Sequence, residues 1–444
     1  MTTDTSQTAT ASSSSTPSLT RMRLVQPGGS VEAGGAPVYE TIARLMVDAY
    51  PVMGVTSADA FARYVERVAA TANDDATAWV IAYRGGAVAG AMRLYDYTMN
   101  ARGTDVLAGG VGSLAVGLAH KRQGVARAMV GWYLAHYRER GATFAVLHPF
   151  RTDFYRALGF GYGTPVHTYR IAPGTLRAEG ARGTVRLLDE RDVVAFLAAS
   201  ERIRATTSGL IRKHDPVTRR SLADIALRWI GVEDDGGTLR GFMQTSVALG
   251  PPGTLNTNEL IVRDLQAEDD AYRAALLGYL RAQRDQFARV IVETQDDAFF
   301  LASDDPRDGS DRSVSPPVTH RVAETGLGMM YRIVDIERAL ALLPRFAAGI
   351  VLRLEVAGVF PAIAGSPAQT FVFGPSRAPY ADAGAEPDAT LRVGVADFSS
   401  LIAGSLRLHD LVRHRLATVT PNGALDRVAA LLDAPQRPVC TTRF

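Results

Sequence analysis

The segment Val111–Val130 constrains the fold of this chain most strongly. It predicts an apolar strand, Val111–Val116, then a polar turn that contains Gly124, then a helix whose apolar residues recur at helical spacing. The first N–H groups of such a helix have no partner within it, and Gly124 lets a ligand approach the backbone without a Cβ in the way. With the helix dipole and the cations Lys121 and Arg122, the turn suits a pyrophosphate. An ordinary glycine-containing turn with solvated basic residues is the alternative.

A second motif follows further along the chain. Strand Phe144–His148 leads into a short helix that contains Tyr155 and ends at Gly159. The two segments Lys121-Arg-Gln-Gly-Val-Ala126 and Tyr155-Arg-Ala-Leu-Gly-Phe160, in this order, resemble the cofactor loop and the following helix of the GNAT acetyltransferases. No Gly-Lys-Ser/Thr follows Gly124, so the turn is not a P-loop.

The resemblance extends over nearly the whole chain, to acetyltransferases of the enhanced-intracellular-survival (Eis) type. It implies an α/β (α+β) fold with two tandem GNAT-type domains, each with a mixed central sheet, followed by a sterol-carrier-like domain. The expected parts are a disordered tail at 1–20, a catalytic GNAT domain at 21–175, a degenerate second copy at 176–327 and the sterol-carrier-like domain at 328–444. A chain of 444 residues is long enough for several domains. The second copy has no glycine-centred phosphate loop after Leu260-Ile-Val-Arg263.

Acetyl-CoA as cosubstrate, without a metal, is what the resemblance implies. The strand residues would offer backbone groups to the pantetheine arm, in the opening between this strand and Phe144–His148. The main-chain amides of the turn would hold the pyrophosphate, and two residues after the next strand would border the far side of the channel. The expected cofactor-binding residues are Leu114, Ala115, Val116, Arg122, Gln123, Gly124, Val125, Ala126, Arg127, Phe150 and Arg151.

Two catalytic residues follow from the same resemblance. Tyr155 matches the tyrosine that acts as general acid toward the departing thiolate, and its alternative role is to pack against or orient the cofactor. Phe444 matches a terminal phenylalanine whose main-chain carboxylate acts as base. A terminal carboxyl has a pKa of about 3.3–3.7, so it needs burial or a relaying water to act as a base at neutral pH. An electrostatic role toward an ammonium substrate is the alternative.

The implied reaction is acetyl transfer to primary amines of a polycationic substrate such as an aminoglycoside. Lysine side chains of proteins or peptides are an alternative substrate, and a non-catalytic acetyl-CoA sensor or lipid-binding protein is the alternative from another class. Asp48 is one candidate partner for the amine, although its interpretation as a solvated helix residue is favoured. The resemblance also implies a homo-oligomer, with a hexamer as the usual state.

Composition excludes several other classes. With 48 basic and 46 acidic residues the net charge is +2, and this balance gives no sign of the excess positive charge that binding to nucleic acid or an anionic membrane requires. The only cysteine is Cys440, so an intramolecular disulfide and a cysteine-based zinc site are excluded. No stretch approaches the roughly 20 apolar residues that a membrane span needs, and the first twenty lack the pattern of a signal peptide. We expect a cytoplasmic protein.

Four further features are expected to carry no chemistry. The polar segment Ser303–Pro317 predicts a mobile insertion. His409 and His414 are spaced wrongly to share one helical face around a metal. Cys440 is expected in the core of a last strand, Val439–Phe444. A basic run predicts a solvated face or a subunit contact; it consists of Arg202, Arg204, Arg212, Lys213, Arg219 and Arg220.

Overall fold

The structure is a computed structural model. It describes residues 20–25, 32–33, 36–71, 74, 76–254, 257–310, 319–343, 350–358, 369–373 and 386–444. The predicted tail at 1–20 lies almost wholly outside these residues, and the predicted insertion lies partly outside them. By internal contacts the chain divides into two units, residues 1–94 with 113–133 and residues 95–112 with 134–444.

The first sheet has seven strands, in the order β1-β4-β5-β6-β7-β16-β8. Their bounds are β1 Arg21–Val25, β4 Thr77–Arg84, β5 Ala87–Ala101, β6 Thr104–Val116, β7 Phe144–Leu147, β16 Met330–Ile333 and β8 Gly161–Tyr162. The helices of this part of the chain are α1 Val38–Ala49, α2 Ala58–Ala70, α3 Val125–Glu139 and α4 Thr152–Arg156. The strands β6 and β7 run parallel, whereas β7 and β16 are antiparallel, so the sheet is mixed.

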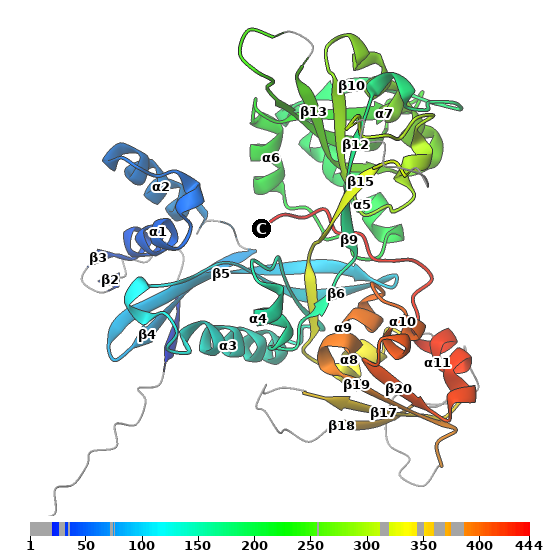
Figure 1. Ribbon diagram of the computed structural model, residues 1–444. Helices are drawn as coiled ribbons and strands as arrows, with labels where there is room; N and C mark the ends of the chain where they lie inside the picture. Colours follow the sequence, from blue (N-terminus) through cyan, green and yellow to red (C-terminus); the bar gives the residue numbers. More distant parts are fainter. Residues whose placement is uncertain are drawn as a thin grey trace, which may run out of the picture. The chain divides into compact units, whose positions relative to one another are not determined.

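The second sheet also has seven strands, in the order β10-β11-β12-β13-β14-β9-β15. Their bounds are β10 Thr184–Leu188, β11 Arg228–Glu233, β12 Leu239–Ala248, β13 Glu259–Ala267, β14 Arg289–Thr294, β9 Pro165–Ile171 and β15 Ala323–Leu327. The accompanying helices are α5 Val193–Thr206, α6 Asp215–Ala223 and α7 Asp270–Ala282 (Figure 1). The pair β13–β14 is parallel, so this sheet is mixed too.

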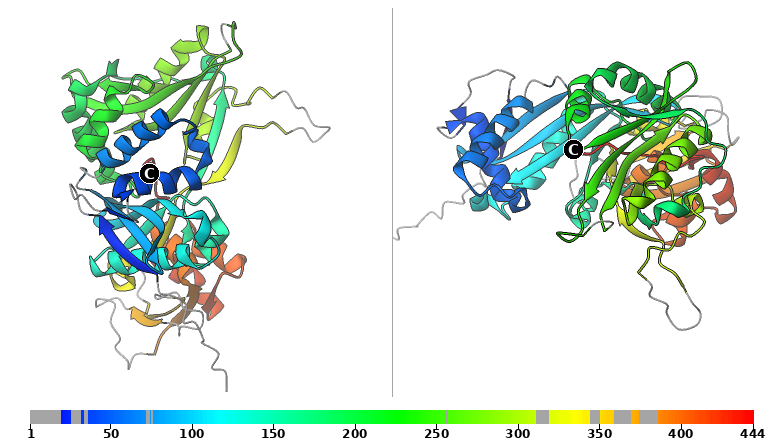
Figure 2. Two further views of the ribbon diagram at one scale, coloured as in Figure 1. Left: turned by 90° about the vertical axis from the view of Figure 1, so that its left-hand side faces the viewer. Right: turned by 90° about the horizontal axis from the view of Figure 1, so that it is seen from above.

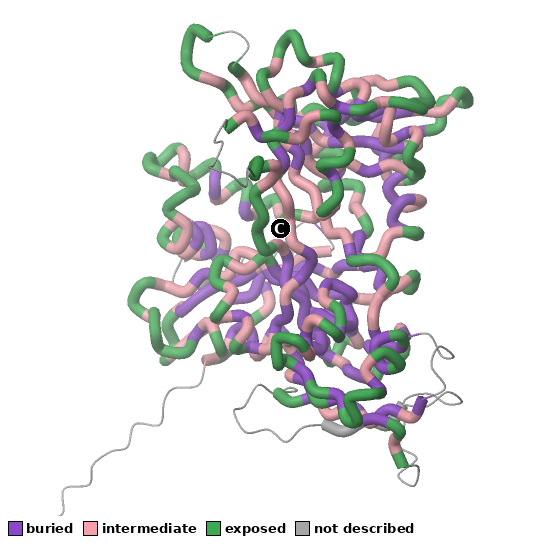
Figure 3. Tube along the Cα trace, turned by 45° about the vertical axis from the view of Figure 1, so that its right-hand side comes forward, coloured by how far each residue is buried: buried purple, intermediate pink, exposed green. Residues whose placement is uncertain are grey.

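Alternating side chains explain why two helices cover this second sheet. On β12, Phe242 packs into a cluster with Phe196 of α5, and the next residue, Met243, packs into a cluster with Leu276 of α7. Successive residues of a strand point to opposite faces, so α5 and α7 cover opposite faces of the sheet. The green part of Figure 2 shows helices and strands of this part of the chain, and Figure 3 colours the chain trace by burial.

A third, four-stranded sheet has the order β18-β17-β19-β20. Its strands are β17 Leu352–Ala357, β18 Gln369–Phe373, β19 Ala389–Gly394 and β20 Ala417–Thr420, and its helices are α8 Ile336–Leu340, α9 Val395–Ala403, α10 Leu408–Arg413 and α11 Leu425–Leu432. The remaining short elements are β2 Glu32–Ala33, β3 Ala36–Pro37 and 3-10 turns at Pro51–Met53, Leu118–His120, Pro173–Thr175, Glu190–Asp192, Gln283–Asp285, Phe299–Ala302 and Asn422–Ala424. The expected mixed α/β class, with two large sheets and a third part, is confirmed.

The two large sheets exchange strands across the predicted domain boundaries. Strand β9, within the range 21–175, pairs with β14 of the second sheet, and β16, within the range 328–444, lies between β7 and β8 of the first. Strand pairing joins residues that are far apart in the chain, so a pattern along the sequence cannot place these strands.

The C-terminal segment differs from the predicted last strand. Residues 437–444 form neither helix nor strand and belong to no sheet, and they run past β9 toward the point marked C in Figure 1. Its backbone bonds to separate partners rather than to a strand: Val439 N–H donates to the Ser208 carbonyl, and Cys440 N–H donates to the side chain of Gln295. Cys440 is accordingly half-buried in a packed but irregular segment, where burial raises the pKa of its thiol to about 12.

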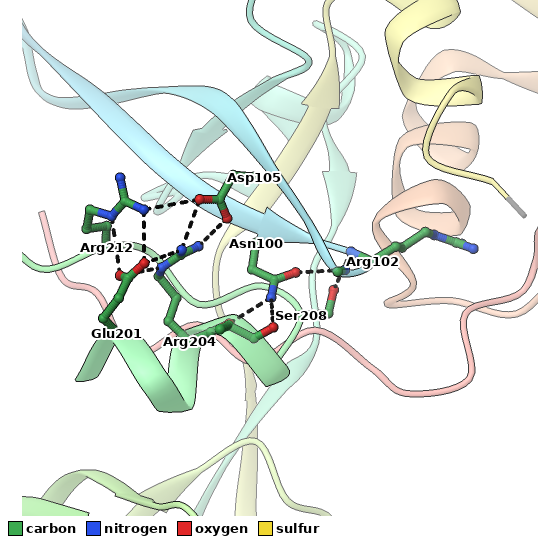
Figure 4. A network of polar contacts seen from close by, with 9 residues as sticks. Asn100, Arg102, Asp105, Glu201, Arg204, Ser208 and Arg212 are labelled. Atoms are coloured by element: carbon green, nitrogen blue, oxygen red, sulfur yellow. Dashed lines mark hydrogen bonds and ion pairs between the residues drawn. The ribbon is translucent and has the colours of Figure 1, made fainter. Parts of the chain in front are cut away.

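The predicted solvated basic run is also wrong for its central member. Arg204 on α5 is buried and forms ion pairs with Asp105 at 2.6 Å and Glu201 at 2.6 Å, and Arg212 bonds to the same two carboxylates (Figure 4). Asp105 follows the Arg102–Gly103 turn of the β5–β6 hairpin, in which both residues have positive φ. The run therefore connects this hairpin to α5.

Candidate active site

The turn before α3 has the geometry that its sequence predicts. Gly124 has φ +82°, and a Cβ built on it would meet no atom within 4 Å, so the backbone there is exposed. Arg122 is also left-handed, at φ 61°. The helix begins at Val125, and its first carbonyl partner is Gly124, which accepts from Ala128 N at 3.0 Å. The amides of Val125, Ala126 and Arg127 therefore have no acceptor within the helix.

The expected pantetheine strand is partly engaged in other contacts. The carbonyl of Leu114 accepts a hydrogen bond from the Tyr50 hydroxyl at 2.8 Å. The carbonyl of Ala115 lies so close to Gly90 that a Cβ there would be 2.6 Å from it. Ala115 is buried, while Leu114 and Val116 are half-buried. Asp48, the candidate amine partner on the nearby helix α1, is exposed, in agreement with its simpler interpretation.

Tyr155 lies on the short helix α4 and is 4% exposed. Its ring contacts those of Phe154 and Phe160, with centroids 5.0 and 5.8 Å apart. The two glycines that follow Tyr155 stand at positions where the surrounding structure leaves no room for a side chain. A Cβ on Gly159, which has φ +83°, would collide with the guanidinium of Arg332, and one on Gly161 would collide with the Ala396 carbonyl. The motif around Tyr155 therefore fixes the backbone of α4 against β16 and α9.

Phe150 and Arg151 stand just before α4. Phe150 is 71% exposed, and its ring is edge-on to that of Tyr155 with centroids 6.2 Å apart. Arg151 is exposed and forms an ion pair with Asp153, which raises the pKa of the guanidinium. An exposed aromatic ring beside a buried tyrosine can contact a ligand, and Arg151 already has its counter-charge.

Phe444 packs in an aromatic cluster. The centroid of its ring lies 5.2 Å from that of Tyr95, 5.1 Å from that of Tyr97 and 5.1 Å from that of His148. Its carboxyl carbon is 3.2 Å from the place where a Cβ on Gly112 would stand. The end of the tail is thus held against β5 and β6, close to the left-handed residue that follows Gly112.

His148, which follows β7 directly, is a residue of the site that the sequence pattern did not indicate. Its Nε2 is 3.0 Å from the carbonyl oxygen of Thr442. Burial lowers the pKa of the imidazole, the Thr442 carbonyl opposes this shift, and the cation of Arg443 adds to it. The neutral ring donates to Thr442 through Nε2. Its place at the carboxyl end of a strand beside the tyrosine motif is the signal that could have identified it.

A cavity of about 780 Å³ adjoins this cluster. It is lined by parts of α5, β13 and β14, by the loop after β14, and by the tail from Val439 to Phe444 with His148. Six carboxylates line it, namely Asp264, Glu268, Asp269, Asp270, Glu293 and Asp296. No group of His, Cys, Asp and Glu side chains among the described residues is arranged to bind a metal.

Most of these carboxylates are paired. Five of the six have an arginine or lysine partner, such as Lys213 for Asp264 at 2.6 Å and Arg273 for Asp296 at 2.8 Å; Glu293 pairs with both Arg263 and Arg443. For Asp270 no ion pair is found within the part of the chain that the structure describes. The charges that line the cavity are therefore largely balanced by cationic partners, and the cavity is not strongly acidic.

Residues 40–163 match the family described as "Acetyltransferase (GNAT) domain". The part of the chain that carries the Gly124 turn, β7 and Tyr155 is therefore a GNAT acetyltransferase domain. The matched segment includes every expected site residue except Phe444.

Particular relatives extend this comparison. The chain is 30% identical over 199 residues to an uncharacterized N-acetyltransferase of Streptomyces avermitilis, a match that covers 40% of this chain and 46%, less than half, of that protein. Two GCN5-related N-acetyltransferase structures share the fold over 96% of this chain. The one from Kribbella flavida has TM-score 0.70, 21% identity and 99% coverage of that chain, and the one from Anabaena variabilis has 0.74, 15% and 100%.

The structure of Eis1 from Mycobacterium abscessus is similar as well, with TM-score 0.69 and 20% identity over 96% of this chain and 100% of that one. At these identities the likeness concerns the fold, and it covers all three parts of this chain. No helix among the described residues is long and apolar enough to span a bilayer.

Proposed function

We propose that this protein is an acetyl-CoA-dependent N-acetyltransferase of the Eis type that acts on primary amines. The observation that carries the proposal is the turn before α3, where a left-handed Gly124 with open space around it precedes helix amides that have no acceptor within the helix. Arg122, Gln123, Gly124, Val125, Ala126 and Arg127 hold the pyrophosphate of acetyl-CoA, and Leu114, Ala115 and Val116 line its pantetheine arm. Phe150 and Arg151 border the channel.

The reaction is a direct transfer. The neutral amine attacks the thioester carbonyl carbon, a C–N bond forms, and the C–S bond breaks as the thiolate leaves. Tyr155 Oη gives its proton to the thiolate, and the proton lost by the amine goes to the carboxylate of Phe444. A phenol with a reference pKa of about 10 is suited to protonate a thiolate.

The surroundings of Phe444 support a carboxylate that acts as base. Its ring is packed among Tyr95, Tyr97 and His148, and its carboxyl carbon lies against Gly112. This packing holds the terminal carboxyl group in one place, as a base requires if it is to stay within reach of the proton that it removes.

A polycationic amine such as an aminoglycoside is the first substrate class to test. The size of the cavity and its six carboxylates support it, and Asp270 is the carboxylate most available to an ammonium group. Because the other five have cationic partners, a lysine side chain with a single charge is the second class.

The further parts of the proposal concern the whole molecule. Residues 21–175 form the catalytic domain, 176–327 a degenerate copy without a cofactor, and 328–444 a sterol-carrier-like domain. The protein is cytoplasmic and assembles as a homohexamer, as the resemblance to the Eis type implies.

The test is release of free thiol from acetyl-CoA by the purified chain. Aminoglycosides, polyamines and lysine peptides are compared, each with the full chain and with a variant that lacks Phe444. Amine-dependent release that is lost on deletion of Phe444, with acetyl-CoA binding retained, is the expected result. Tight acetyl-CoA binding without release for any amine would point instead to a non-catalytic sensor or lipid-binding protein.

A further inference from the structure

The parallel strand pairs of the two large sheets share a feature. In both, the longer strand continues beyond the paired stretch and contains a non-glycine residue with a left-handed backbone, Ser113 at φ 48° on β6 and Asp264 at φ 52° on β13. The paired stretches are Ala108–Gly110 with Phe144–Val146, and Glu259–Val262 with Arg289–Val292. Such a residue bends a strand and interrupts pairing. The break in β13 therefore corresponds to the break in β6.

In the second sheet the space beyond this break is occupied by the chain's own tail. Gln266 of β13 donates from Nε2 to Thr441 Oγ1 at 3.1 Å. Gln295, just after β14, accepts from the backbone N–H of Cys440 at 2.5 Å through Oε1. Gln266 and Gln295 thus bind two successive residues of the tail, Thr441 and Cys440.

The rest of the tail is fixed residue by residue. The Thr164 hydroxyl donates to the carbonyl of Pro438 at 2.7 Å, and Val439 N–H donates to the Ser208 carbonyl at 2.8 Å. Gly209, at φ +93°, lets the tail pass close to its backbone, since a Cβ at this position would be 2.6 Å from the Val439 carbonyl oxygen. His148 then holds Thr442.

We propose that the opening between β13 and β14 is a receptor for residues 438–444 of the same chain, and that Gln266 and Gln295 are positioning residues for Phe444. The inference rests on the proposed function, in which the carboxylate of Phe444 is the base. The second domain uses the place that corresponds to the pantetheine site of the first domain to hold a catalytic group instead of a cofactor.

The physical reason for two amide contacts is precision. A base must lie within hydrogen-bond reach of the proton that it removes, and a displacement of about 1 Å costs on the order of 10²-fold in rate. A free chain end loses its position easily. Contacts three and four residues before Phe444 restrict the position of its carboxylate.

Cys440 provides a readout of tail docking that needs no catalysis. It is the only cysteine of the chain, and in the docked tail it is half-buried with a raised thiol pKa. The full chain and its variants Gln266→Ala, Gln295→Ala and the double variant are labelled with a thiol reagent at pH 8. The control is Gln283→Ala, whose side chain bonds to the Tyr279 carbonyl and not to the tail.

The expected result is labelling at least about ten-fold faster in the double variant and unchanged in the control, since a docked thiol with raised pKa has little thiolate. Thr441→Val removes the other partner of the Gln266 hydrogen bond and leaves a side chain of the same shape. It should accelerate labelling as Gln266→Ala does, and the two changes together should add little, because they remove one interaction.

The activity of the same variants separates the two hypotheses. With a working acetyl acceptor, the double variant should lose about ten-fold or more in kcat while KM for acetyl-CoA changes less than two-fold. Unchanged labelling in the double variant, with circular dichroism showing an intact fold, overturns the receptor. Faster labelling with unchanged kcat overturns the positioning role of the two glutamines.

If no amine is acetylated by any form of the protein, the proposed function fails while the labelling result still decides the receptor. Acetyl-CoA binding measured by calorimetry adds a last check. The stoichiometry should remain one per chain after residues 438–444 are removed, and a rise to two would mean that the opening is a second cofactor site.

Discussion

At the scale of the residue, steric room sets much of this site. Gly159 and Gly209 have left-handed backbones at places where a Cβ would strike another part of the chain, whereas Gly124 has the same backbone with open space around it. The sequence motif marks Gly124 and Gly159 equally. Only the three-dimensional surroundings distinguish a glycine that makes room for the protein from one that makes room for a ligand.

The first prediction concerns the acid. Tyr155→Phe keeps the ring that packs between Phe154 and Phe160 and removes only the hydroxyl, so kcat should fall about 10²-fold with little change in KM for acetyl-CoA. Thiol release measures it. Tyr162→Phe, a change to a nearby tyrosine with no proposed role, is the control. An unchanged kcat would leave Tyr155 a packing residue.

A second prediction concerns the charge next to the proposed base. Arg443→Gln removes one of the two cations paired with Glu293 and makes the cavity more negative. KM for a polycationic amine should fall several-fold at low salt, and the gain should shrink as ionic strength rises. Arg437→Gln, which removes an exposed partner of Asp297 outside the cavity lining, is the control. A gain that is equal in both variants would contradict a local effect.

At the scale of the element, helices and strands were predictable from periodicity where local chemistry decides them. The pattern predicts a strand at Phe144–His148, and the structure has β7 at Phe144–Leu147. The terminal segment was predicted as a strand because it contains β-branched residues, yet it is irregular, since Gln266, Gln295 and His148 bind it through side chains. Propensity says nothing about partners from elsewhere in the chain.

The turn before α3 gives the third prediction. Gly124→Ala forces an alanine to adopt φ +82°, at a cost of about 1–2 kcal/mol, and places a methyl group where the pyrophosphate is proposed to lie. KM for acetyl-CoA should rise about ten-fold or more. Gly131→Ala lies within α3, where a Cβ meets nothing within 4 Å, and should stabilise the protein by roughly 0.5–1 kcal/mol.

Thermal unfolding and thiol-release kinetics of these two variants check the prediction. A rise in KM of similar size in both would mean that the helix rather than the glycine carries the effect.

At the scale of the whole molecule, contacts between distant parts of the chain were beyond the sequence. The run with Arg204 was predicted as solvated because Asp105, the partner that connects it to another part of the chain, is 99 residues away in the sequence. His148 and the two glutamines that hold the tail were missed for the same reason. The motifs indicated the cofactor turn and Tyr155 because those segments carry their own signal.

The ion-pair cluster on α5 gives the fourth prediction. Hydrogen bonds from Arg204 and Arg212 lower the pKa of Glu201 to about 2. A carboxyl with a lowered pKa stabilises the fold above its unfolded value of about 4.3, and this contribution is lost as pH falls toward 2. Because the side chain is partly exposed, the effect should be only about 1 kcal/mol.

Urea unfolding between pH 7 and 3 measures it, and Glu201→Gln should flatten the curve below pH 4.5. The control is Glu190→Gln, a change of another carboxylate in the turn before α5. Equal flattening in both would exclude the cluster as the cause.

The exchange of β9 and β16 between the two large sheets has a consequence for synthesis on the ribosome. Strands β7 and β8 emerge early, but β16, which lies between them, is made only after the entire second sheet. The edges of β7 and β8 that pair with β16 stay unpaired until residue 333 has left the exit tunnel. The nascent chain therefore needs its last third to complete its first sheet. A gene cut between the two GNAT-like halves should therefore yield two fragments that recover their fold only when they are expressed together.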